Sequence, residues 1–470
     1  METTTATVIA RTTDAKPNSA PIEVIWEPVA LGKRRVSPGQ ARKELELLPL
    51  DSQLSTTPSD HVLITTGVMG QLGADLSVSC QESAAERDLS NPTYRAKVLT
   101  MNRLLNYRKN RHGHPVDDHE IVVTGTQPRV HFVVGTEGVG LRALVHSLQQ
   151  FLGDDLKPVD VSVGSGQVMR YFRLESLVII PALTSGPKAI ARYVARYIGA
   201  KLHPGLARRG RGTLFSTEEE AITSTQAILL AANVGAIIVG PLHTREAEPH
   251  HASRGWGMLA SIAVATGIPI VILGTAGMAV GLVEQSAALT TLTSRGVYVI
   301  EPFGRYSRAW RNVAHFIWLK YIASSAQPPD WFVVELWRLT FGRIELAVKL
   351  GAFISGAWAV DGPQELTAAL LAGYASNALV LEQPFLRAIQ RAELGGEFQR
   401  GPVLRYADWL PLRTVLNSFP SLDLGDDYSD RKVYPKLPEP APVPYGVSTS
   451  EVLRATLPQQ PETLLQGAAQ

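Results

Sequence analysis

The sequence is poor in cysteine and in long apolar runs. Cys80 is the single cysteine, so no internal disulfide framework is possible, and this favours a reducing compartment. The most apolar stretches, residues 227–239 and 268–283, are interrupted by Gly, Asn or Pro and fall short of the ~18 apolar residues of a membrane span. Residues 1–21 also have no apolar core of signal-peptide length. These features predict a cytoplasmic protein with no membrane partner.

Charge is scarce and unevenly distributed. Charged residues make up 19% of the 470 residues and the net charge is +2, whereas 45% are hydrophobic, enough for a substantial core. Residues 91–111 depart from this balance, because they carry six basic residues and no acid. Val98, Met101, Leu104 and Leu105 recur there at helical spacing, which predicts a basic amphipathic helix.

Apolar runs alternate with helical patterns between His119 and Ile300. Strands are expected at 130–134, 177–181, 236–239, 269–273 and 297–300, and helices at 141–152, 188–202, 216–233 and 257–266. Such alternation is typical of a parallel sheet with crossover helices, hence of an α/β fold.

The flanks differ from this central part in composition. Residues 1–90 are rich in Thr, Ser, Pro and Ala, which predicts a flexible or loosely docked arm with a possible short strand at 62–65. The α/β core and its preceding basic helix are assigned to residues 91–304, and an all-helical lid to 305–395, with helices at 331–339, 344–353 and 363–378. Residues 396–470 contain an acidic patch and a Pro-rich stretch, which favours a linker or docking peptide.

A glycine-rich turn joins the first core strand to its helix. Its glycines, Gly135 and Gly140, have the spacing of GxxxxGK[ST], in which backbone N–H groups and a helix N-terminus cradle phosphates. Leu141 stands at the lysine position and Arg142 at the Ser/Thr position. The nucleotide-loop-like residues are Gly135, Thr136, Glu137, Gly138, Val139, Gly140, Leu141 and Arg142.

The ends of two further strands correspond to positions that carry functional residues in a P-loop ATPase. The strand at 236–239 ends in Gly240 and Pro241, where an ATPase would carry the Asp-Glu pair that binds magnesium and activates water. Neither residue coordinates a metal or acts as a base. The strand at 269–273 is followed by Thr275, which is either a phosphate sensor or a capping residue of a core strand.

The order of these segments resembles the TnsC/TniB family of AAA+ transposition regulators. The resemblance covers residues 92–395 and is carried by VVGTEGVGLRAL, ALTSGPKAIARYV, STEEEAITSTQAILLAANVGAIIVGPLH, GIPIVILGTAGM, SRGVYVIEPF and FGRIELAVKLG. It implies a P-loop NTPase-like (AAA+) sheet followed by a helical lid. The sequence departs from the family at Leu141, Arg142, Gly240 and Pro241, so hydrolysis is not carried over, and neither ATP nor magnesium is an expected cofactor.

The resemblance also gives two arginines candidate roles. Arg295 matches an arginine that reaches a neighbour's nucleotide in a ring or filament, and the alternative is a solvated surface arginine. Arg343 stands where a lid arginine contacts phosphate, and the alternative is a surface charge at a helix start.

Two basic clusters are candidates for binding DNA phosphates. A charge run is also consistent with a solvated face. The histidine-rich loop around His243, His250 and His251 has no spacing typical of a metal site, so a polar surface loop is expected and no metal. The candidate DNA-binding residues are Arg95, Lys97, Arg103, Arg108, Lys109, Arg111, Arg208, Arg209 and Arg211.

Three functions follow as hypotheses. The first is a non-hydrolysing adaptor that links target-DNA selection to a transposase; its partners would be duplex DNA, transposase subunits, a target selector, and copies of itself or an active paralogue. Such a protein would be bacterial, cytoplasmic and nucleoid-associated when bound to DNA. The second is an ATPase with a rewired site using Arg142, Glu137 or Glu246, and the third is a scaffold with no DNA role, suggested by Pro435 to Pro444.

Overall fold

The computed structural model describes nine stretches of the chain. By their contacts the residues divide into two units, 1–419 and 420–470, and every described residue lies in the first. The described ranges are 11–12, 34–47, 62–110, 127–162, 168–202, 215–283, 285–323, 327–393 and 405–417.

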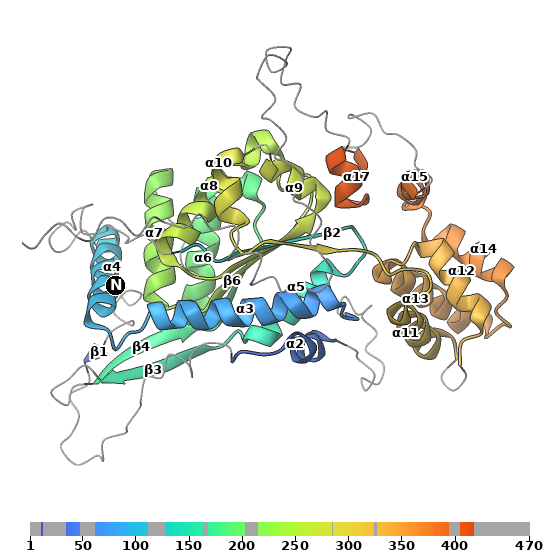
Figure 1. Cartoon of the computed structure of the whole chain (residues 1–470), viewed down its shortest axis with the longest axis horizontal. Coiled ribbons are helices and arrows are strands. Elements are labelled where there is room, and N and C mark those ends of the chain that lie inside the picture. Colours follow the sequence, from blue (N-terminus) through green and yellow to red (C-terminus); the bar gives the residue numbers. More distant parts are fainter. Residues whose placement is uncertain are drawn as a thin grey trace, which may run out of the picture. The chain divides into compact units, whose positions relative to one another are not determined.

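The five strands of a parallel sheet follow the order β5–β6–β7–β2–β8. Two of them, β2 and β6, are labelled in Figure 1. The strand that precedes the glycine-rich turn, β2, therefore lies between β7 and β8. All five expected strands are present, with small shifts at their ends. Their bounds are β2 (Val130–Gly135), β5 (Ser176–Ile179), β6 (Ala236–Leu242), β7 (Ile270–Thr275) and β8 (Val297–Ile300).

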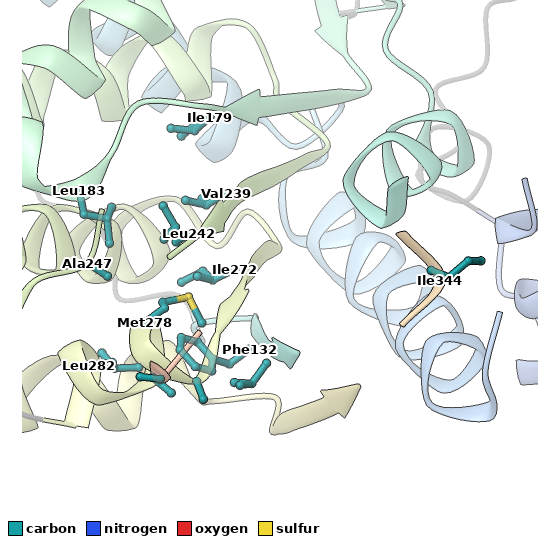
Figure 2. Close-up of a cluster of buried hydrophobic side chains, with 14 of the residues drawn as sticks. Phe132, Ile179, Leu183, Val239, Leu242, Ala247, Ile272, Met278, Leu282 and Ile344 are labelled. Carbon is teal, nitrogen blue, oxygen red and sulfur yellow. The ribbon is translucent and has the colours of Figure 1, made fainter. Parts of the chain in front are cut away.

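Helices cover both faces of the sheet. Alternate residues of each strand point to opposite sides, so each strand contributes side chains to two cores. Phe132 and Val134 belong to the core on the side of α6, α7 and α8, whereas Val133 belongs to the core with α3 and α5. Figure 2 shows Ile179, Val239, Ile272 and Phe132 of successive strands among the buried side chains of the first core. The helices against the sheet are α3 (Gly67–Glu86), α5 (Leu141–Leu152), α6 (Gly186–Leu202), α7 (Glu218–Ala231), α8 (Pro249–Thr266), α9 (Ala276–Val283) and α10 (Ser286–Leu292).

The N-terminal part is more ordered than its composition predicts. The expected loose arm is wrong for residues 67–86, which form α3, with Leu72 and Leu76 fully buried in the second core. Small residues let the helix approach the sheet closely, and Ser83 Oγ donates to Gly267 O at 2.7 Å. The shorter α2 (Pro38–Leu45) packs on α3, and Leu63, in the possible strand at 62–65, pairs as an isolated bridge with Leu47.

The expected basic helix is present as α4 (Pro92–Asn110), which packs on α7. An antiparallel hairpin, β3 (Leu156–Ser162) and β4 (Val168–Leu174), was not expected from the sequence, and β1 (Arg11–Thr12) pairs with β4. These three strands form a second sheet.

The chain after the sheet is helical, as expected. Trp337 Nε1 donates to Phe303 O at 2.7 Å and so ties the lid helices to the end of the core. The parallel sheet, its crossover helices and this helical part together confirm the P-loop NTPase-like (AAA+) fold class. The lid elements are α11 (Arg308–Ile317), the π-turn η3 (Trp318–Ile322), α12 (Asp330–Thr340), α13 (Ile344–Asp361), α14 (Ala368–Ala378) and α15 (Gln383–Glu393).

The expectation of a linker or docking tail from residue 396 is wrong for residues 405–417. Ala407, Leu410 and Val415 have no exposed surface and belong to the first core. A short helix, α17 (Leu412–Asn417), contacts α9. The acidic and Pro-rich stretches lie outside the described residues. No described helix has the length and apolarity needed to cross a membrane.

Candidate nucleotide-loop site

The glycine-rich turn lies between the end of β2 and the start of α5 and contains two glycines with positive φ. Gly138 and Gly140 have φ of +82° and +96°, in the left-handed region that favours glycine, and Gly140 is the N-cap of α5. Thr136 is buried between them and the strand, and its Oγ1 has no hydrogen-bond partner among the described residues. The loop therefore keeps its frame at the carboxyl end of β2.

The lysine position faces inward. Leu141 is 5% exposed, and a Cβ added at Gly135 would lie 2.9 Å from Leu141 Cδ2, so the side chain turns back onto the strand end. The next residue, Arg142, is exposed on α5. The residue at the lysine position therefore brings no positive charge to the loop.

The end of β6 is shaped by close packing. A Cβ on Gly240 would lie 2.3 Å from Leu273 O, and the register of β6 against β7 is irregular between Val239 and Leu242. Pro241 is only partly buried. Gly240 thus allows β6 to lie close to β7. The Gly-Pro pair presents no carboxylate at the Asp-Glu position.

A carboxylate reaches this edge from the far end of the chain. Asp408 Oδ1 accepts hydrogen bonds from Thr244 N at 2.9 Å and Thr244 Oγ1 at 2.7 Å, and also from Thr275 Oγ1. Its backbone O accepts from Glu137 N, in the loop, at 2.6 Å. Thr275, the sensor candidate, is therefore bound to a carboxylate of its own chain, and sequence reasoning singled out neither Asp408 nor Thr244.

An ion pair closes the loop beside this carboxylate. Glu137 Oε2 lies 2.8 Å from His243 Nε2, and Glu246 Oε2 accepts from His243 N at 2.9 Å. Burial raises the pKa of the Glu137 carboxyl, but the His243 hydrogen bond and the charges of His243, Arg142 and Arg343 outweigh it, so the pKa is lowered. The hydrogen bond to Glu137, opposed by burial, raises the pKa of His243, with further support from Asp408 and Glu246.

Arg343 is not the surface charge of the alternative interpretation. It is 1% exposed, although it sits at the N-cap of α13, and Gly138 leaves room for it, since an added Cβ would lie 3.3 Å from Arg343 Cβ. It donates to Glu137 O at 3.1 Å, to Phe341 O at 3.3 Å and to Trp409 O at 2.8 Å. The lid arginine therefore reaches the loop.

Arg295 lies elsewhere. It forms an ion pair with Glu82 on α3, and Glu82 also pairs with Arg129. To reach a neighbour's nucleotide, Arg295 would first have to leave this pair.

Three of the DNA candidates have side chains that the structure describes, and they differ in exposure. Arg103 is exposed on α4, whereas Arg95 is partly buried and donates to Leu89 O, and burial lowers the pKa of the half-buried Lys97. The side chains of Arg108 and Lys109 fall outside what the structure describes. So do the whole residues Arg111, Arg208, Arg209 and Arg211.

A cavity of about 310 Å³ lies next to the loop. Gly135 and Thr136 form one wall, Ile300 of β8 another, and Leu412 and Leu416 of α17 a third. Among the described residues, His, Cys, Asp and Glu form no group of three placed to hold a metal ion. His243 is instead committed to Glu137 and Glu246.

No protein-family model matches the chain, and no curated protein matches it. The solved structures that are similar to it include two of the Aeropyrum pernix ORC2 protein. The ADP form has 15% sequence identity over 65% of this chain and 77% of that chain, with a TM-score of 0.35. The ADPNP-ADP complexes have 12% identity over 66% and 78%, also with a TM-score of 0.35. At this level neither likeness bears on function, and the fold assignment rests on the strand order and the helical lid.

Proposed function

We propose that this chain is an AAA+-like adaptor of the TnsC/TniB type, which connects target DNA to a transposase without hydrolysing nucleotide. The observation that supports it is the replacement of the site's chemistry. Leu141 is buried at the lysine position, Gly240 and Pro241 replace the acids, and Asp408 of the same chain binds the sensor Thr275. The frame of an ATPase remains, with its reactive groups exchanged for structural ones.

Phosphoryl transfer needs a cation on the terminal phosphates, a held magnesium ion and a group that positions water. The groups that a rewired site would use are engaged elsewhere. Glu137 and Glu246 both bind His243, and Arg142 projects from the exposed side of α5. These contacts favour the adaptor over the rewired ATPase.

The fold does not need a ligand to persist, because its sheet is covered by apolar side chains on both faces. In the proposal, assembly with copies of itself or with an active paralogue depends on partners and DNA rather than on nucleotide. An oligomer size that changes strongly with ATP would contradict this part of the proposal.

Duplex DNA is the proposed target, bound through its phosphates independently of sequence. Among the described side chains, Arg103 on α4 supports this role, since it is exposed on a helix whose other face packs on α7. In the sequence, the other candidates between Arg95 and Arg111 belong to the same basic stretch, and Arg208, Arg209 and Arg211 form a second one.

Filter binding of duplex DNA across a salt series tests the proposal. The intact chain should bind with an affinity that falls steeply with salt, and Arg103→Glu should weaken binding and lower the salt slope by about one unit. The matched control is Arg254→Glu on α8, where Arg254 is exposed and paired with Glu218. Absence of salt-sensitive binding, together with absence of association with transposase subunits, would refute the adaptor; partner binding without DNA binding would favour a scaffold.

A further inference from the structure

We propose that the carboxyl edge of the sheet still is an anion site, and that the Asp408 carboxylate is its resident anion, in place of a nucleotide phosphate. The chain thus carries its own ligand, residues 405–412. This goes beyond the proposed function and does not depend on a role in DNA binding.

The donors around Asp408 are those of an oxyanion site. An amide N–H and two hydroxyls converge on a single oxygen, Oδ1, from the ends of two neighbouring strands, β6 and β7. The donors themselves are uncharged, so the negative charge is held by hydrogen bonds, as backbone amides and hydroxyls hold carboxylate or phosphate oxygens elsewhere. A carboxylate at this position accepts hydrogen bonds both from Thr275, the sensor candidate, and from the turn after β6.

The site is also shaped for a close approach. A Cβ on Gly277, at the start of α9, would lie 1.8 Å from Thr244 Oγ1 and 2.8 Å from Asp408 Oδ1. Only glycine leaves room for both oxygens at this position. Gly277 therefore supports the bound position of the carboxylate independently of the hydrogen bonds.

The same segment fastens the lid to the loop. Asp408 O accepts from Glu137 N, and the next residue's carbonyl, Trp409 O, accepts from Arg343, which also donates to Glu137 O. The Trp409 ring is stacked on Phe385 of α15, with centroids 4.9 Å apart. The core loop, the lid arginine and a lid helix thus meet at two adjacent residues, Asp408 and Trp409.

Site-resolved amide hydrogen exchange tests this directly, because the Thr244 amide donates to the carboxylate itself. In Asp408→Ala, exchange at Thr244 should accelerate by about tenfold or more, since a hydrogen bond to a charged acceptor is lost. Asp361→Ala, which removes an exposed carboxyl at the end of α13, is the matched control and should leave Thr244 unchanged. Equal exchange at Thr244 in intact protein and in Asp408→Ala would overturn the proposal.

Inorganic phosphate then distinguishes an anion site from a purely structural contact. Millimolar phosphate should restore slow exchange at Thr244 in Asp408→Ala and have no effect on the intact chain, where the site is filled. Failure of phosphate to slow exchange in a folded Asp408→Ala protein would contradict the anion site, whatever the outcome of the DNA experiments.

Gly277→Ala serves if Asp408→Ala does not fold. The added methyl group should displace the carboxylate, accelerate exchange at Thr244, and also at Glu345, whose amide donates to Gly138 O in the loop. Gly257→Ala on α8, where an added Cβ meets nothing within 4 Å, is its control. Unchanged exchange at both amides in Gly277→Ala would overturn the coupling of carboxylate and lid.

Discussion

Two histidines, one within the sheet and one at its carboxyl edge, have pKa values shifted in opposite directions. His131, on β2, is fully buried, with its Nε2 3.0 Å from Ser79 Oγ and its Nδ1 3.3 Å from Tyr298 Oη, and burial lowers its pKa to about 4. His243, just beyond β6, has its pKa raised by the hydrogen bond to Glu137. Burial thus favours the neutral form of His131, whereas the hydrogen bond to Glu137 favours the charged form of His243.

The two histidines separate the body of the sheet from its carboxyl edge. The body of the sheet is stabilised mainly by apolar contacts on both of its faces. Its carboxyl edge gathers charged groups, and there the chain supplies Asp408 and the Glu137–His243 pair. The groups that contact the glycine-rich loop at this edge thus come from the chain itself.

The largest change in the free energy of unfolding should come from a substitution in the apolar core of the sheet. Trp256 on α8 is fully buried, and its ring lies 6.4 Å from that of Phe132. Trp256→Ala should lower the free energy of unfolding by about 3–5 kcal/mol, because it leaves a large cavity. Urea denaturation measures this, and a loss below about 1 kcal/mol would contradict the apolar account of the sheet.

The next largest effect should be a loss of stability at low pH, which arises from His131 in the core of the sheet. Its pKa in the folded state, about 4, is below its ordinary value of 6.5, so the unfolded state binds the proton first. Stability present above pH 6.5 should therefore be lost as the pH falls toward 4, by about 3 kcal/mol in total. Urea titrations of His131→Gln should show a flatter pH dependence over this range; an unchanged slope would count against it.

His243 should give the opposite trend with pH, and a smaller effect. Its raised pKa stabilises the folded state fully below its ordinary value of 6.5, and this is lost as the pH rises through the folded pKa. The lowered pKa of Glu137 adds stability above 4.5 that is lost as the pH falls. The pair should contribute most between pH 4.5 and 6.5.

His243→Gln measures this contribution. We expect a loss of about 1–2 kcal/mol within that window and a smaller loss above it, because a hydrogen bond between charged groups is removed at a partly exposed position. Thermal unfolding at several pH values provides the comparison. A loss that grows as the pH rises would contradict a charged His243.

The smallest effect is expected at Arg142, the exposed residue at the Ser/Thr position. Arg142→Ala should change the free energy of unfolding by no more than about 0.5 kcal/mol, as for most surface substitutions. Calorimetric unfolding measures it. A loss several times larger would give Arg142 a structural role that its exposure does not indicate.

Much of the sheet could be predicted from local sequence. The apolar run Val130–Gly135 and the periodic Leu141–Leu152 appear in the structure as β2 and α5, because periodicity is a local property. By contrast, α3 was missed, since Gly, Ser and Ala let it pack closely without a clear apolar stripe. The β3–β4 hairpin was also missed, although the sequence between its strands contains Gly164-Ser165-Gly166, a turn signal.

For the candidate site, the sequence shows which nucleotide-binding residues are missing, but not which groups lie in their place. The loss of lysine and of the acids is visible at Leu141 and Gly240, but their replacement is not. Asp408 is separated from Glu137 by most of the core and the lid, and a single carboxyl after Tyr406 and Ala407 carries no motif. Tertiary contact alone brings it to Thr244 and Thr275.

Calorimetric titration of the intact chain with Mg–ATP shows whether Asp408, rather than a nucleotide, occupies the carboxyl edge of the sheet. We expect no saturable heat up to millimolar nucleotide. Saturable binding of one ATP per chain at micromolar concentration, with Asp408 intact, would contradict it.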